Sequence, residues 1–184
     1  MIVRTDGWLD GVCRVDSPNF DARPPDSTIS LIVVHAISLP PGHYGGGYVS
    51  KLFTNTLDAS AHSHFAQIAG LCVSAHVLIE RDGAVTQFVS FADRAWHAGT
   101  SCFEGRSACN DFSIGIELEG TDFEVFSDLQ YEALNRITTA LLPVYPITAM
   151  RGHSDIAPGR KTDPGPFFDW SRITRPSSVS IPSV

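Results

Sequence analysis

The residues best suited to chemistry in this sequence lie together in one stretch, RGHSDIAPGRKTDPG, at residues 151–165. The stretch contains His153, two aspartates and a lysine, and its glycines and prolines are incompatible with a long helix. Loops held on a rigid scaffold concentrate binding and catalytic groups because they can point side chains into a cleft. We therefore interpret the stretch as part of a functional site that residues elsewhere in the chain complete.

A second histidine, His35, follows a continuously apolar run at residues 31–34, which is typical of a strand buried on both faces. In open α/β sheets, ligands bind beyond the carboxyl ends of the strands. With His153 and one aspartate, His35 would supply two nitrogens and one oxygen, a ligand set that suits Zn²⁺ with an open fourth position. The alternative is that His35 satisfies a hydrogen bond at the sheet and His153 only orders its loop.

Two aspartates compete for the third ligand position, and their spacing does not choose between them. Pro164 restricts the backbone of Asp163 to extended geometry, which holds its carboxylate in one direction. Asp155 equally suits a hydrogen bond to the outer nitrogen of a ligating histidine.

Two glutamates, Glu117 and Glu119, alternate in SIGIELEG, so both carboxylates point to the same face of an expected strand. We expect Glu119 to be solvated or paired. For Glu117 the functional alternative is a general base that accepts a proton from a metal-bound water. Lys161 is either a solvated surface lysine or a group that stabilises a developing oxyanion.

Two further segments carry polar or flexible residues. In RAWHAG, core packing is the simpler interpretation of Trp96, whereas His97 has little apolar sequence around it. The glycine-rich loop at residues 39–48 is either a plain surface loop or a gate over a groove, because glycine permits unusual backbone angles.

The elements that must position these groups appear as apolar β-branched runs and amphipathic segments. Arg81-Asp82-Gly83 predicts a tight turn between antiparallel strands. The clearest helix is 127–142, where Ser127 and Gln130 form a capping box. Strands are expected at 31–37, 75–80, 85–89, 113–118 and 147–151, and further helices at 49–56 and 61–68. These elements predict an α/β fold, a mixed β-sheet flanked by helices.

Length and composition restrict the class of protein. A chain of 184 residues fits one domain, which we place at residues 1–175, with a frayed tail at 176–184. A net charge of −7 argues against nucleic-acid and anionic-membrane partners, and no run approaches the ~20 apolar residues of a membrane helix. Four cysteines without a C-x-x-C pair indicate free thiols, and the beginning of the chain lacks the apolar run of a signal peptide. We therefore expect a cytoplasmic protein.

Five segments in this order resemble one known family. They are VVHAISLPPG, VSAHVLIERDG, RAWHAG, CNDFSIGIELEGTD and GHSDIAPGRKTDPG. Together, over about residues 8–170, they resemble the zinc N-acetylmuramoyl-L-alanine amidases, a family that includes phage amidases and peptidoglycan recognition proteins, and most closely its cytosolic members of peptidoglycan recycling. The resemblance implies a mixed sheet flanked by helices, with Zn²⁺ held in a groove on one face.

The resemblance also implies roles for individual residues. By the family's pattern, His35, His153 and Asp163 are the zinc ligands, and Asp155 is structural. Glu117 matches the catalytic acid or base. Lys161 matches the residue that stabilises the transition state. The residues expected to bind substrate are Tyr48, Ala95, Trp96, His97 and Asn110.

The implied reaction is zinc-dependent hydrolysis of the amide bond between (1,6-anhydro-)N-acetylmuramic acid and L-alanine of a muropeptide, carried out by a monomer. The alternative is a non-catalytic muropeptide-binding or regulatory protein of the same fold, as in relatives that have lost a zinc ligand. Because this chain keeps all three ligand positions together with Glu117 and Lys161, the enzyme is favoured.

The chain departs from the family's pattern beside the site. Ala36 stands where an asparagine is usual, and Cys72 and Ala108 stand where basic residues are common. Ser154 replaces a common cysteine, a nearly isosteric change that we expect to be neutral. The first three departures predict an altered substrate preference and leave the ligand positions intact.

Overall fold

A six-stranded mixed sheet forms the centre of the computed structural model, which describes residues 1–182. The strand order is β1-β5-β4-β9-β3-β10, and every pair is parallel except β4 and β5. These strands are β1 (Cys13–Arg14), β3 (Leu31–Ile37), β4 (Val77–Ile79), β5 (Val85–Gln87), β9 (Ser113–Glu119) and β10 (Ala149–Gly152). The mixed sheet and the antiparallel hairpin around Asp82-Gly83 are therefore confirmed.

Smaller elements surround this sheet. The strands β2 (Phe20–Asp21) and β6 (Arg94–Ala95) pair with each other, as do β7 (Cys102–Phe103) and β8 (Arg106–Ser107). The helices are α1 (Tyr48–Phe53), α2 (Phe65–Ile68), α3 (Asp128–Leu141) and α4 (His153–Ile156), with 3-10 turns η1 (Cys109–Asp111) and η2 (Trp170–Arg172). No helix within residues 1–182 is long and apolar enough to cross a membrane.

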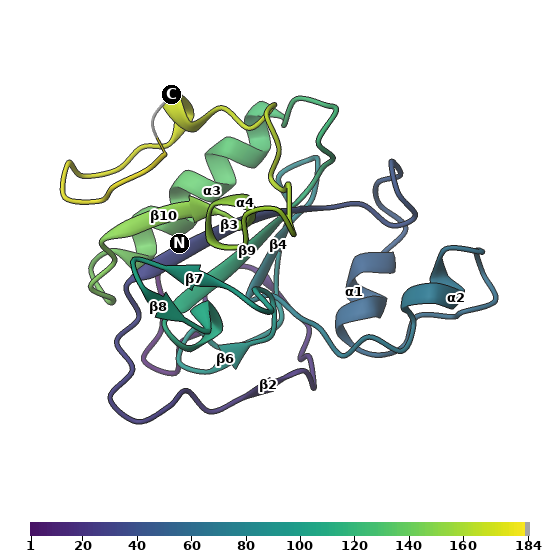
Figure 1. The fold of residues 1–184 in the computed structure, drawn as a ribbon, viewed down its shortest axis with the longest axis horizontal. Coiled ribbons are helices and arrows are strands. Elements are labelled where there is room, and N and C mark those ends of the chain that lie inside the picture. Colours follow the sequence, from purple (N-terminus) through teal and green to yellow (C-terminus); the bar gives the residue numbers. More distant parts are fainter. Residues whose placement is uncertain (183–184) are drawn as a thin grey trace.

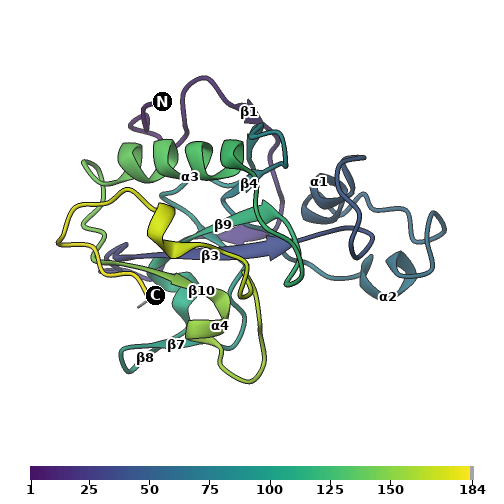
Figure 2. The same ribbon diagram turned by 90° about the horizontal axis from the view of Figure 1, so that it is seen from above.

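Helix α3 covers one face of the sheet (Figure 2). Its residues Leu134 and Ile137 belong to one buried cluster with Ile114 and Ile116 of β9. The predicted capping box is present: the Ser127 hydroxyl accepts from the Gln130 N–H, and the Gln130 side chain accepts from the Ser127 N–H. The helix predicted at 127–142 is thus confirmed within a residue at each end.

The opposite face of the sheet is covered by α4 and the β7–β8 hairpin, while α1 and α2 lie to one side beyond the strand ends (Figures 1 and 2). Cys109 of η1 packs on this face in one buried cluster with Leu31 and Val33 of β3. Because side chains alternate along a strand, the residues of β9 that do not face α3 point to this second face. They are Ser113, Gly115, Glu117 and Glu119.

The strands predicted at 75–80, 85–89 and 147–151 are shorter, at Val77–Ile79, Val85–Gln87 and Ala149–Gly152, and the short helices and the tail also differ from the sequence-based expectations. The helices predicted at 49–56 and 61–68 are shorter, at Tyr48–Phe53 and Phe65–Ile68, and Asn55 beyond α1 has a left-handed φ of 59°. The tail is not frayed up to residue 182. Val179 is buried, and Ser180 pairs in parallel with Ala149, because β10 offers an unpaired edge to which a strand-like segment can bond. Residues 183–184 lie outside the described part.

Candidate metal centre

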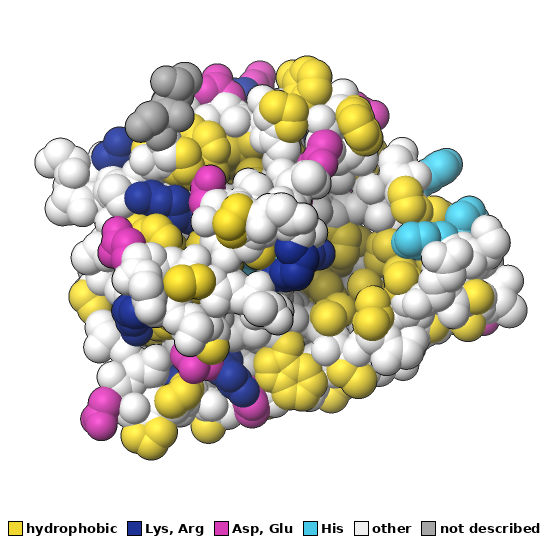
Figure 3. Space-filling model, in the orientation of Figure 1, with side chains coloured by type: hydrophobic (Ala, Val, Ile, Leu, Met, Phe, Trp, Pro, Cys, Tyr) yellow, Lys and Arg dark blue, Asp and Glu magenta, His cyan; other side chains and the backbone are white. Residues whose placement is uncertain are grey.

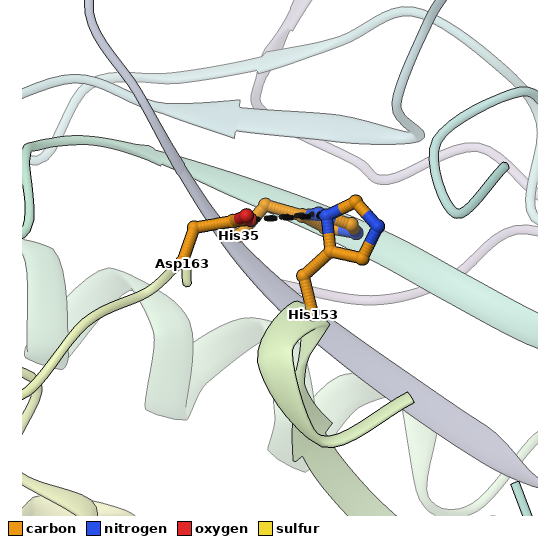
Figure 4. A group of neighbouring side chains, drawn as sticks. All are labelled: His35, His153 and Asp163. Carbon is orange, nitrogen blue, oxygen red and sulfur yellow. Dashed lines mark hydrogen bonds and ion pairs between the residues drawn. The ribbon is translucent and has the colours of Figure 1, made fainter. Parts of the chain in front are cut away.

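Two histidines from neighbouring strands meet at one end of the sheet. His35 lies near the carboxyl end of β3, and His153 is the first residue of α4, directly after the adjacent parallel strand β10. Asp163 arrives from the loop after α4, which is tied back by a hydrogen bond from the Ser154 N–H to the Asp163 carbonyl. Figure 4 shows the three side chains pointing toward one another.

The three candidate ligand atoms lie close together. The Nδ1 atoms of His35 and His153 are 2.9 Å apart, and each is 3.2 Å from Oδ2 of Asp163. Both histidines are buried, and the side chain of Asp163 is 16% exposed. This is a group that could hold a metal ion. Asp155, the rival aspartate, instead accepts the Gly152 N–H at the start of α4.

The electrostatics of the group suit a divalent cation. Burial lowers the pKa of His35 to about 4, although its hydrogen bond to Asp163 opposes the shift. Burial also opposes ionisation of Asp163, but its hydrogen bonds to His153 and His35 outweigh this and hold its pKa below the ordinary range. At neutral pH the group therefore offers a neutral imidazole and a carboxylate, and two imidazole nitrogens with one carboxylate oxygen form a donor set found in catalytic zinc sites.

Glu117 lies beside this group because of strand register. In the parallel pairing of β3 and β9, Glu117 is the partner of His35. The side chain is buried, and its Oε2 atom has no hydrogen-bond partner. Burial raises the pKa of Glu117 well above its ordinary value; the negative Asp163 adds to the shift and Lys161 opposes it. An unpaired carboxyl group with a perturbed pKa in a cavity is a candidate general acid or base.

The candidate metal centre lies between two hollows. A cavity of about 240 Å³ contains His35, Glu117 and His153 together with apolar side chains. The apolar members are Ala36, Ile37, Phe53, Leu71, Val73 and Trp96. A second cavity of about 580 Å³ shares Ala36, Lys161 and Asp163 with the first. Figure 3 shows a hollow lined by hydrophobic side chains with basic side chains at its rim.

The candidate catalytic and substrate-binding residues separate into two groups. Lys161, Trp96 and His97 line the cavity of the candidate metal centre, and Lys161 is exposed. The others do not line it. Ala95 is fully buried in the core, and the Tyr48 ring packs against Phe65 beside another hollow. The side-chain oxygen of Asn110 accepts backbone N–H groups rather than facing the cavity.

Sequence reasoning missed two arginines that order the backbone around the site. Arg160 donates to the carbonyls of Ala98 and Thr100. Arg23 is partly buried and donates to four backbone carbonyls, those of Phe91, Asn110, Asp111 and Ser113. Arg160 lies inside the polar stretch at 151–165, which is a usable signal, whereas nothing around Arg23 in the sequence marks it.

Comparisons with known proteins show the family to which this chain belongs. Residues 25–166 match the family model described as N-acetylmuramoyl-L-alanine amidase. The chain is 60% identical over 169 residues to the 1,6-anhydro-N-acetylmuramyl-L-alanine amidase AmpD of Escherichia coli (strain K12), which covers 91% of this chain and 92% of the relative. The crystal structure of a selenomethionine AmpD derivative superimposes with a TM-score of 0.92 at 56% identity, over 95% of this chain and 100% of that one.

A more distant structure was solved with a ligand. The amidase AmiD from E. coli, in complex with the substrate anhydro-N-acetylmuramic acid-L-Ala-D-γ-Glu-L-Lys, has a TM-score of 0.59 and 27% identity over 93% of this chain and 63% of that one. The family model spans most of the sequence, and the curated relative matches nearly end to end. This chain therefore belongs to the N-acetylmuramoyl-L-alanine amidase family.

Proposed function

We propose that this chain is a zinc-dependent amidase that hydrolyses the bond between 1,6-anhydro-N-acetylmuramic acid and the L-alanine of muropeptides. The observation that carries the proposal is the unpaired, buried Oε2 of Glu117 in the same cavity as His35, His153 and Asp163. Its support from relatives is the high identity to amidases named for this bond.

His35, His153 and Asp163 would hold the Zn²⁺ ion, with both histidines binding through Nδ1. When bound, zinc supplies Lewis acidity toward a water molecule and toward the amide carbonyl. The two histidines are buried and the Asp163 side chain is only 16% exposed, which limits competing solvent around them.

Glu117 acts as the general base and then as the general acid. Its high pKa and free Oε2 suit it to take a proton from the attacking water and to return that proton to the departing amine of L-alanine. The exposed ammonium of Lys161, on the rim shared by the two cavities, offsets negative charge on the carbonyl oxygen as the tetrahedral transition state forms.

The two hollows give room for the two parts of the substrate that the scissile amide joins, the sugar on one side and the stem peptide on the other. Ala36 lines both hollows. Its methyl group offers the substrate no hydrogen bond beside the candidate metal centre. Cys72 is exposed between Leu71 and Val73, which line the cavity of the candidate metal centre. We infer that these two departures alter substrate preference rather than the bond that is cut.

The test is release of peptide from anhydro-muropeptide, followed by mass spectrometry with and without a chelator. We expect chelation to abolish release and added zinc to restore it. Glu117→Gln keeps the size of the side chain and removes the base, so turnover falls about 100- to 10,000-fold. Glu119→Gln, two residues along the same face of β9, is the matched control and loses far less.

Two outcomes would contradict the proposal. Release that continues at full rate after the metal is removed would exclude zinc chemistry. Tight binding of the muropeptide without any turnover would favour the alternative, a non-catalytic muropeptide-binding protein of the same fold.

The setting of the reaction is also a proposal. The four cysteines are free thiols, and three of them are exposed, which suits a reducing compartment such as the cytoplasm. A monomeric state and the lack of nucleic-acid and membrane partners remain predictions from the sequence.

A further inference from the structure

The outer nitrogens of the two candidate ligand histidines point to neighbouring residues of one segment. Nε2 of His35 lies 2.9 Å from Nδ1 of His97, and Nε2 of His153 lies 3.1 Å from the carbonyl oxygen of Ala98. His97 and Ala98 follow β6 in the chain, separated from it only by Trp96. A single dipeptide therefore contacts both histidines on the side away from Asp163.

The position of the hydrogen on each of these imidazole rings follows from which ring nitrogen faces the metal. A histidine that gives the Nδ1 lone pair to a metal carries its hydrogen on Nε2. His35 then donates to Nδ1 of His97, and His153 donates to the Ala98 carbonyl. Because Nδ1 of His97 accepts, its own hydrogen is on Nε2, which lies 3.2 Å from the hydroxyl of Ser113. Both ring nitrogens of His97 are thus occupied by protein groups.

The rest of the segment is held by side chains that do not touch the candidate ligand atoms. Oδ1 of Asn110 accepts the N–H groups of His97 and Ala98, at 3.2 and 2.8 Å. Arg160 donates to the Ala98 carbonyl at 2.6 Å from the other side. These contacts fix the backbone that presents both acceptors.

The sheet itself makes room for the His97 ring. A Cβ atom placed on Gly115 in the middle of β9 would lie 2.4 Å from the ring, so only glycine fits there. Glycine weakens a strand interior unless another group must approach the backbone closely. At this position the approaching group is the imidazole of His97.

We propose that His97 is a positioning residue for the metal centre: it orients His35 through Nε2 and sets which nitrogen faces the metal, while Ala98 does the same for His153 through its carbonyl. The inference rests on the proposed zinc site. It replaces the substrate-binding role expected for His97, because both ring nitrogens of His97 contact protein groups.

The test measures zinc affinity rather than turnover. Zinc dissociation constants are determined by competition with a chromophoric chelator for the wild type, His97→Leu and His97→Asn. Leucine removes the acceptor, so zinc should bind about 10- to 100-fold more weakly. Asparagine places Oδ1 near the position of Nδ1, so it should restore most of the affinity. The visible absorption bands of the Co²⁺-substituted protein should change in the leucine variant and resemble wild type in the asparagine variant.

Further variants separate positioning from general disruption. Ser113→Ala and Gly115→Ala act on His97 without touching the ligands, and both should weaken zinc binding. Trp96→Phe, in the same cavity but outside the chain of contacts, should leave zinc affinity unchanged, whatever its effect on turnover. Circular dichroism of the metal-free proteins identifies any variant that fails to fold, and the remaining variants then carry the test.

One result would overturn the inference. If His97→Leu binds zinc as tightly as the wild type while the KM for anhydro-muropeptide rises at saturating zinc, His97 contacts substrate instead. If the proposed function itself were wrong, the wild type would bind no zinc in the same competition assay. The two outcomes can therefore be distinguished.

Discussion

The two faces of β9 differ in the kind of side chain that they bury. Toward α3, Ile114, Ile116 and Leu118 are fully buried in an apolar cluster. Toward the candidate site, the alternate residues include Glu117 and Glu119, which are also buried. Burial of a carboxylate is costly unless it is paired, so the second face carries a free-energy cost that the first does not.

The two glutamates differ in how that cost is met. Glu119 accepts the backbone N–H groups of Gly45 and Arg81, at 2.7 and 3.3 Å. Glu117 has an oxygen with no partner. One buried carboxylate thus joins the glycine-rich loop to the sheet, and the other keeps an oxygen free for chemistry. The comparison predicts that mutations on the apolar face, at Glu117 and at Glu119 have different effects on stability and on activity.

The largest stability effect is expected on the apolar face. Ile116→Ala leaves a cavity beneath α3 and should lower the free energy of unfolding by about 2–5 kcal/mol, as measured by chemical denaturation. Ile116→Val is the matched control and should cost about 1 kcal/mol. Turnover per folded molecule should remain within a few-fold of wild type. A large loss of turnover in fully folded Ile116→Val would show that the two faces are not independent.

Glu117→Gln should show the reverse behaviour, with lost activity in the zinc-loaded protein and gained stability in the metal-free protein. The pKa of Glu117 is raised in the folded state, so ionisation destabilises the fold as pH rises above the ordinary value of about 4.5. The variant should match wild type in stability below that pH. It should become more stable by about 1–3 kcal/mol once folded Glu117 is ionised. Thermal unfolding at several pH values in the presence of a chelator measures this, and equal stability at all pH values would contradict it.

The smallest effect is expected at Glu119. Glu119→Gln keeps an acceptor but loses its charge, so it should cost about 1 kcal/mol. Hydrogen exchange of the Gly45 amide should become faster, because that N–H donates to Glu119. Glu124→Gln, which alters an exposed hydrogen bond from Tyr44 in the same loop, should change the exchange less. Unchanged exchange at Gly45 in Glu119→Gln would show that the loop is held elsewhere.

The fold was predictable where local pattern and tertiary packing agree. The apolar runs around His35 and Glu117 became β3 and β9, and the capping box at Ser127 marked the start of α3. The tail was not predictable, because burial of Val179 depends on the free edge of β10 rather than on the composition of the tail.

The candidate site was only partly predictable from the residues alone. Spacing left Asp155 and Asp163 equivalent, and the resemblance to the family favoured Asp163. In the structure Asp155 bonds to the Gly152 N–H, a local contact that no spacing rule distinguishes from ligation. The contact of His97 with His35 joins residues far apart in the sequence, and no local signal reports it.

The pairing of His35 with Glu117 across β3 and β9 has a consequence for how this chain can vary in length. Side chains alternate with a period of two, so inserting or deleting one residue in either strand would turn the groups beyond it to the α3 face. Loops such as 39–48 can gain or lose residues without moving either group. Insertions and deletions within the family should therefore occur in the loops and leave the lengths and the register of these two strands unchanged.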